Sequence, residues 1–163
     1  MQWDFVTDII LYASFAVLAV FIVLGAIQLF QKKSLKKVDR ALTAMFPPLV
    51  IMTAIYFIFD KIWILNTRPN GSGEPSFPSS HAMAVATIFG MTALALPKYI
   101  KSKPLRITLY TIMLILLILV CIGRVASGMH WATDVACGLV FAFILVILYY
   151  LISKPSKKET KHE

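Results

Sequence analysis

Basic, histidine, serine and aspartate side chains gather in three short segments of this chain, next to long apolar stretches. The segments are KIWILNTRP at 61–69, FPSSH at 77–81 and GRVASGMHWATD at 123–134. Phosphoryl transfer needs positive charge around the phosphate oxygens, a nucleophile in line with the departing oxygen, and a proton for that oxygen. The three segments contain side chains of each kind, so together they predict a site that handles phosphate.

The positive charges of this predicted site come from Lys61, Arg68 and Arg124. A planar guanidinium can bind two phosphate oxygens at once, whereas a lysine acts as a point charge. Taken singly, each base has the alternative role of an interfacial anchor paired with a nearby acid, namely Asp60, Glu74 or Asp134. Taken with the two neighbouring histidines, the three bases indicate a cage for phosphate oxygens.

The serine pair follows Pro78, where a helix is expected to begin. Ser79 and Ser80 precede His81 and a long apolar run. Free backbone N–H groups and the positive end of the helix dipole make such a position suitable for an anion. Simple capping of the helix by a serine is an equally ordinary role, and the two roles are compatible.

His130 and Asp134 are four residues apart where the last apolar run begins, so they share one face of the expected helix. A carboxylate on one ring nitrogen would leave the other with its lone pair toward the cage, which makes His130 the expected nucleophile. Histidines and an aspartate also form metal sites. However, three cations would repel a divalent ion, and we therefore predict no metal and no cofactor.

The composition places these residues in a membrane protein. Hydrophobic residues make up 59% of the 163, far above the share found in soluble domains. Lipid excludes open sheets, and the runs lack the alternation of a membrane barrel. Five uncharged runs, each close to the length that spans a bilayer, predict an all-α bundle of about five transmembrane helices in one domain, 1–153; the runs are 9–30, 41–59, 82–97, 107–123 and 135–153.

The basic residues predict the orientation of this bundle. Thirteen of the 16 Lys and Arg residues fall in 31–40, in 98–106 and in the tail 154–163, which lie on one side if five helices alternate. By the positive-inside rule that side is cytoplasmic, and the tail is a basic cytoplasmic segment. The N-terminal flank MQWDFVTD contains two aspartates and no base, unlike a secretory signal. We expect an N-terminus and an active site on the periplasmic or extracellular side of a bacterial or archaeal cell membrane.

The motifs resemble the three signatures of the type 2 phosphatidic acid phosphatase superfamily, which also includes vanadium haloperoxidases. They read Lys, six residues, Arg-Pro; Pro-Ser-x-His; and Arg, five residues, His, three residues, Asp. The resemblance implies that His130 attacks phosphorus, that Asp134 orients it, and that His81 protonates the leaving oxygen and later activates water. It also implies a set of phosphate-binding residues, namely Lys61, Arg68, Ser79, Arg124 and the amide of Ser80.

Three departures from the family pattern accompany the resemblance. Gly123 stands where the family often has Ser, and Ser80 stands where it often has Gly. Relatives often have six spanning helices, and five are expected here. The first departure removes a hydroxyl donor, and the last bears on lateral packing and oligomeric state, which the sequence does not determine.

The sequence therefore predicts a membrane lipid phosphatase that acts through a phosphohistidine. Candidate substrates are lipid phosphates in a membrane: undecaprenyl diphosphate, phosphatidylglycerol phosphate, phosphatidate and lipid A 1-phosphate. A lipid phosphotransferase with the same intermediate is an open alternative. A lipid or anion transporter is a third, although transport usually needs ionisable groups near the midplane. We expect no nucleic acid partner.

Overall fold

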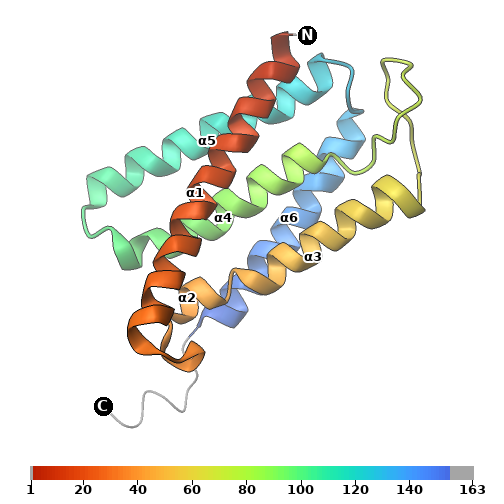
Figure 1. Cartoon of the computed structure of the whole chain (residues 1–163). Helices are drawn as coiled ribbons and strands as arrows, with labels where there is room; N and C mark the ends of the chain where they lie inside the picture. Colours follow the sequence, from red (N-terminus) through yellow and green to blue (C-terminus); the bar gives the residue numbers. More distant parts are fainter. Residues whose placement is uncertain (1, 155–163) are drawn as a thin grey trace.

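The computed structural model describes residues 2–154 as a bundle of helices (Figure 1). Five stretches of helix are long and apolar enough to cross a membrane, which confirms the predicted class. Within the described residues the only β-type pairing is an isolated bridge between Thr67 and Pro75. The helices are α1 (Gln2–Lys32), α2 (Arg40–Thr43), α3 (Phe46–Phe57), α4 (Ser80–Tyr99), α5 (Lys103–Ala126) and α6 (Ala132–Ser153), with a 3₁₀ turn η1 (Leu35–Lys37) and a π-helical turn η2 (Ile58–Ile62).

Local sequence signals explain where these helices begin. Ser79 caps α4, its hydroxyl accepting from the N–H of Ala82, and Pro104 occupies the first turn of α5, where no N–H partner is needed. At α6 the carboxylate of Asp134 accepts from the N–H of Trp131 at 3.0 Å. Because such caps lie outside the apolar runs, α1, α4, α5 and α6 are longer than the runs, whereas the run 41–59 is divided among α2, α3 and η2. The largest extension is in α1, which begins at Gln2 rather than near residue 9.

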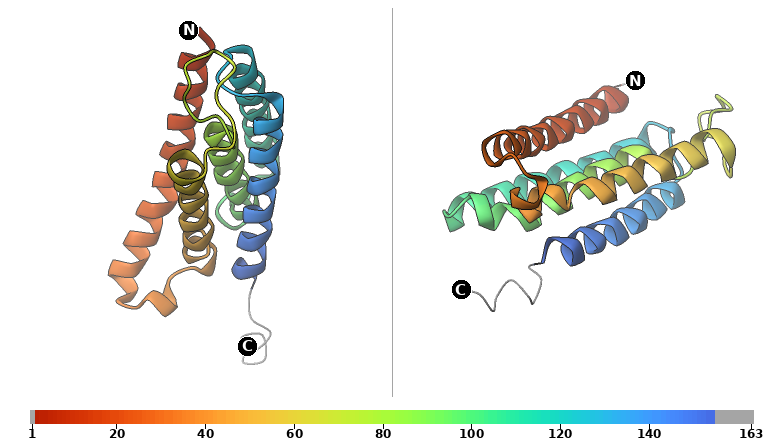
Figure 2. Two further views of the ribbon diagram at one scale, coloured as in Figure 1. Left: turned by 90° about the vertical axis from the view of Figure 1, so that its right-hand side faces the viewer. Right: turned by 60° about the horizontal axis from the view of Figure 1, so that its bottom comes forward.

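α4 is the central helix of the bundle and packs against α1, α3, α5 and α6 (Figure 2). Its buried side chains include Ala82, Met83, Val85 and Ile88. The outer helices instead expose many large apolar side chains, which a water-soluble protein would not leave uncovered over so wide an area. Lipid is therefore the solvent for their outer faces.

α4 and α6 approach each other closely near the start of both helices. A Cβ atom on Gly138 would lie 2.8 Å from the backbone oxygen of Ser79, so only glycine allows this approach. The N–H of Ser79 donates to the backbone oxygen of Asp134 at 3.1 Å. The second and third sequence motifs are thereby fixed against each other.

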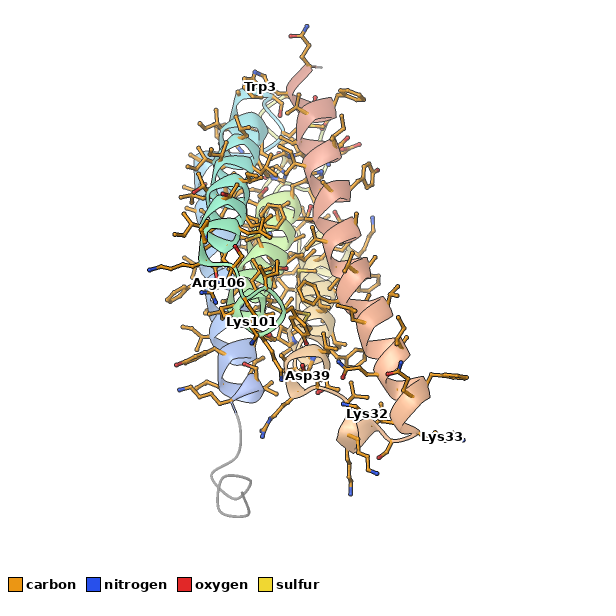
Figure 3. All side chains as sticks on the ribbon, turned by 90° about the vertical axis from the view of Figure 1, so that its left-hand side faces the viewer. Trp3, Lys32, Lys33, Asp39, Lys101 and Arg106 are labelled. Atoms are coloured by element: carbon orange, nitrogen blue, oxygen red, sulfur yellow. The ribbon has the colours of Figure 1, made fainter. Side chains whose placement is uncertain are left out.

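The two ends of the bundle differ in charge. The N-terminus of α1 and the connections 63–79 and 127–131 meet at one end (Figure 1). Lys32, Lys33, Lys101 and Arg106 lie toward the opposite end from Trp3 (Figure 3). This is the separation that five alternating helices require. Of the predicted tail 154–163, residues 155–163 lie outside the described part of the chain.

A polar network at the basic end joins three helices. Asp39 accepts from Lys98 Nζ at 2.5 Å and from the Tyr99 hydroxyl at 2.7 Å, and its own N–H donates to the side chain of Gln28 at 2.8 Å. Burial opposes the charge of Asp39, but these donors and the Ala41 N–H lower the pKa of its carboxyl. Asp39 thus links the end of α1, and the start of α2, to the end of α4.

Candidate active site

A cavity of about 170 Å³ opens at the end of the bundle that carries the N-terminus. Its walls include five of the eight predicted site residues: Arg68, Ser80, His81, Arg124 and His130. They come from α4, α5 and the two connections 63–79 and 127–131. Segments far apart in the sequence are therefore brought together as the motifs predicted.

His130 is almost fully buried, with 4% of its surface exposed, and both ring nitrogens have partners. Its Nδ1 lies 2.6 Å from the backbone oxygen of Ser76, which can only accept, so Nδ1 carries the hydrogen. Nε2 is left with its lone pair, and Arg124 Nη2 lies 3.2 Å from it. The ring is thus held in the tautomer that a nitrogen nucleophile requires.

The electrostatic surroundings keep this ring neutral. Burial, and next the guanidinium of Arg124, lower the pKa of His130 to about 4, against smaller opposing effects of the Ser76 carbonyl and Asp134. Since a protonated ring has no lone pair on Nε2, a lowered pKa keeps this lone pair available at neutral pH.

Asp134 is placed differently from the expectation. It is fully buried, but the hydrogen bond to the His130 ring that the spacing suggested is not formed. Its Oδ2 accepts from the backbone N–H of Trp131. Because α6 begins at Ala132, His130 precedes the helix and the expected i, i+4 pairing on one helical face does not apply. The Ser76 carbonyl orients His130 instead, and Asp134 acts on it through its charge.

Arg124 is the most enclosed cation of the site, with 3% of its surface exposed. Its Nη1 lies 3.8 Å and 4.0 Å from carboxylate oxygens of Asp4 and Asp8, and it donates to the Thr7 hydroxyl at 3.4 Å. These three partners all belong to the first turns of α1. The first helix therefore supplies the counter-charges of Arg124.

The second motif divides into a capping residue and two cavity residues. Ser79 is fully buried, caps α4 and does not reach the cavity wall. Ser80 and His81 do reach it. His81 Nε2 lies 2.8 Å from Asp8 Oδ1, and its Nδ1 is buried with no hydrogen-bond partner among the described residues.

The first motif contributes Arg68 to the cavity but not Lys61. Arg68 Nη1 pairs with Glu74, and its Nε donates to the Pro75 oxygen at 3.4 Å. Lys61 lies on the π-helical turn, 62% exposed, and pairs with Asp60 at 2.7 Å; Asp60, rather than Lys61, lines the cavity.

The connection 63–79 folds back over the third motif. The indole Nε1–H of Trp131 donates to the Thr67 oxygen at 3.0 Å, and the Asn70 N–H donates to the Gly128 oxygen at 3.0 Å. Gly128 has a φ of +68°, a conformation that favours glycine. These bonds hold the connection against the third motif, and within the connection the Ser76 N–H donates to the Asn66 oxygen at 3.0 Å.

An apolar groove of about 330 Å³ adjoins the cavity between α1, α3 and α4. Tyr56, Ser80 and His81 line both spaces. The rest of the groove wall is mostly apolar and includes Leu11, Phe15, Met52 and Met83. His81 thus stands where a polar cavity meets a surface suited to a hydrocarbon chain.

Comparison with known proteins gives the family. A family model described as the PAP2 superfamily matches residues 57–158, more than half of the chain. The chain belongs to the PAP2 superfamily. The matched segment contains all three motifs, whereas α1 lies outside it.

Two relatives are informative. Phosphatidylglycerophosphatase B of Bacillus subtilis (strain 168) is 34% identical over 95 residues, covering 54% of this chain and 46% of the relative. The chain thus spans about half the length of this curated relative. A crystal structure described as the first transmembrane PAP2 type phosphatidylglycerolphosphate phosphatase from Bacillus subtilis has a TM-score of 0.64 at 24% identity, covering 97% of this chain and 77% of that one, and it shares the fold.

Four parts of this PAP2 site were not predicted from the sequence. The Ser76 carbonyl is a backbone group, for which no residue type is diagnostic. The sequence places Tyr56 in a spanning run and Asp60 in an ion pair, whereas in the structure both line the cavity, with Asp60 on the π-helical turn. The sequence identifies Asp8 only as a negative charge in the N-terminal flank. The i, i+4 spacing of two aspartates beside an apolar run was the available signal for it.

Proposed function

We propose that the chain is a membrane lipid phosphatase that hydrolyses a lipid phosphate or diphosphate through a phosphohistidine at His130. The observation that carries this proposal is the buried, neutral ring of His130, whose Nδ1 is fixed on Ser76 and whose Nε2 adjoins Arg124 in the cavity. A fixed nucleophile beside a cation is the arrangement that phosphoryl transfer needs.

In the first step the lone pair of His130 Nε2 attacks phosphorus. Arg124 gives up its contact with Nε2 and, with Arg68 and the start of α4 at Ser80, binds the phosphate oxygens. Lys61 joins them by exchanging Asp60 for phosphate, since its side chain is exposed and flexible. The bond from phosphorus to the lipid oxygen breaks, and that oxygen takes a proton from His81.

In the second step a water molecule attacks the phosphorus of the phosphohistidine. His81, now neutral, takes a proton from this water, the phosphorus–nitrogen bond breaks, and inorganic phosphate leaves. His130 regains its lone pair and the site returns to its initial state. Asp134 stabilises the positive charge that develops on His130 and holds the start of α6.

A lipid substrate accounts for the groove beside the cavity. With the phosphate in the cavity, the bond to be broken lies near His81, and an acyl or prenyl chain extends along Leu11, Phe15 and Met52. Phosphatidylglycerol phosphate is the favoured headgroup, because both relatives are described by their action on it. We place the site on the outer side of the membrane, opposite the basic end.

The test is phosphate release by the purified protein from four lipids in detergent or vesicles: phosphatidylglycerol phosphate, phosphatidate, undecaprenyl diphosphate and lipid A 1-phosphate. We expect activity that persists in a chelator, is inhibited by vanadate, and is absent from His130→Ala. Transfer of the phosphate to a second lipid rather than to water would establish the phosphotransferase instead. Activity that is lost in chelator and restored by one metal would contradict the proposal.

A further inference from the structure

Asp8 of the first helix is the acidic residue that contacts a proposed catalytic histidine directly. Its Oδ1 lies 2.8 Å from Nε2 of His81. A carboxylate cannot donate, so Nε2 carries the hydrogen of this bond. The ring nitrogen that remains for proton exchange is Nδ1, which is buried and has no partner among the described residues.

The same aspartate is held in place by the packing of α1 on α5. Asp8 lies one helical turn after Asp4, and both carboxylates approach Arg124 Nη1, at 4.0 Å and 3.8 Å. Between them Thr7 is fully buried and its hydroxyl accepts from Arg124. These contacts fix the position of Asp8 on α1, although its own side chain is 46% exposed.

The charges around His81 make the role of this carboxylate clear. Arg124 of α5 and Arg68 of the connection 63–79 line the same cavity as His81 and disfavour a second positive charge there. Asp8, with Asp4 behind it, is the negative charge that faces them from α1. A ring that donates a proton to the leaving oxygen must be protonated beforehand. A neighbouring carboxylate stabilises that protonated ring.

We propose that Asp8 is a positioning residue for His81: it fixes the ring through Nε2–H and stabilises the protonated ring that gives its Nδ1 proton to the leaving oxygen. After that transfer the ring is neutral, with the Nε2 hydrogen still on Asp8, and Nδ1 is free to take a proton from the attacking water. The inference rests on the proposed function and assigns a role to α1, which lies outside the matched family segment.

The first experiment compares two substrates of different leaving group. Help from a general acid matters for a poor leaving group such as a lipid alkoxide and little for a nitrophenolate. Asp8→Asn keeps an acceptor for Nε2–H but removes the charge, and Asp8→Ala removes both. We expect kcat on the lipid monoester to fall about tenfold or more in Asp8→Asn, and further in Asp8→Ala, with a much smaller fall on nitrophenyl phosphate.

Asp39→Asn is the matched control. Asp39 also links the α1 side of the bundle to α4, through Lys98 and Tyr99, but at the opposite end from the cavity. Loss of this link lowers thermal stability and leaves the ratio of the two activities at the wild-type value. A purely structural role of Asp8 would give the same pattern.

The second experiment asks whether Asp8 acts through His81. In a His81→Ala background, Asp8→Asn should have no further effect on the lipid monoester, because the group it positions is gone. An equal loss on both substrates in Asp8→Asn, or additive losses in the double variant, would overturn the inference and leave the proposed function standing. Failure of the wild-type protein to hydrolyse either ester would instead contradict the proposed function itself.

Discussion

At the scale of single residues, the chemistry of the site depends on which atom binds each histidine. His130 is fixed by a backbone carbonyl and His81 by a carboxylate, so their rings carry hydrogen on different nitrogens, Nδ1 in the first and Nε2 in the second. The environment of His130 favours the neutral ring that a nucleophile needs. This difference matches the roles proposed for them, a nucleophile and an acid, although both residues are histidines.

The state of His130 can be observed directly, because the chain has three histidines. The variant with His81→Gln and His162→Gln retains only His130, whose nitrogen signals can then be followed by NMR. We expect the Nδ1–H tautomer at neutral pH and protonation of the ring only as the pH falls to about 4. The pKa of His130 is shifted downward because burial and Arg124 both destabilise the charged ring. Protonation near the ordinary value of about 6.5 would show that the ring is solvated.

The two histidines should also differ in kinetics. His81→Ala should cost about 10²- to 10⁴-fold on a lipid monoester and much less on nitrophenyl phosphate, whose leaving group needs no proton. His130→Ala should abolish turnover of both, because the phosphoryl acceptor is absent. Rates and trapped phosphoenzyme are the measurements. Equal ratios of the two activities in both variants, or phosphoenzyme in His130→Ala, would mean that the roles are wrongly assigned.

The residues that could be predicted from the sequence are those whose type is required by the chemistry. Arg68, His81, Arg124 and His130 follow from the need for cations, a nucleophile and an acid, and the structure brings them into one cavity. The hydrogen-bond partners of the histidines could not be predicted. They depend on how the connection 63–79 and helix α1 pack, and many side chains and every backbone oxygen can serve as acceptors.

At the scale of elements, the five spanning helices could be predicted because lipid requires long uncharged runs. Their ends could not, because capping groups and water outside the hydrocarbon extend a helix by local interactions. The consequence is largest at α1, where the extension to Gln2 turns an acidic flank into a helical face that contacts α5. The same contact between α1 and α5 explains why Gly123 stands where the family often has Ser.

Gly123 permits the close approach of α1 to α5. A Cβ atom at this position would lie 2.6 Å from Thr7 Cγ2 and 3.2 Å from Trp3 Cε3. Gly123→Ala should therefore lower the free energy of unfolding by about 1–3 kcal/mol, the usual cost of overpacking, as measured by thermal or denaturant unfolding in detergent. Activity should fall as well, since Asp8 and Arg124 lie beside this contact.

Two further variants test this explanation. Thr7→Ser removes Cγ2 but keeps the hydroxyl that binds Arg124, so it should restore part of the stability of Gly123→Ala. Gly25→Ala on α1 is the control, because its nearest neighbour would be Leu42 Cβ at 3.9 Å, an ordinary contact. An equal loss of stability in the control would show that replacing a helical glycine has this effect in general. The contact with Thr7 and Trp3 would then not be the cause.

At the scale of the whole molecule, charge and chemistry occupy opposite ends of the bundle. The basic segments lie at the end with the polar network of Asp39, opposite the end with the N-terminus (Figure 1). The cavity of the proposed catalytic residues lies at the N-terminal end. Hydrogen bonds join α4 to neighbouring segments at both ends. α4 therefore fixes the position of one end of the bundle relative to the other. In the proposed function, phosphate is therefore released on the side of the membrane opposite the basic segments.

This orientation can be tested with single cysteines in a chain whose own Cys121 and Cys137 are replaced by alanine. Ser72 lies in the connection beside the cavity and Ser102 precedes α5 at the basic end, and both are exposed. If the basic end is cytoplasmic, an impermeant thiol reagent added outside intact cells should label Ser72→Cys and should label Ser102→Cys only after the membrane is permeabilised. Each variant should first be shown to retain phosphate release, which confirms that the bundle is intact. Labelling of Ser102→Cys alone in intact cells would reverse the orientation and place phosphate release in the cytoplasm, while the assignment of the histidines would be unaffected.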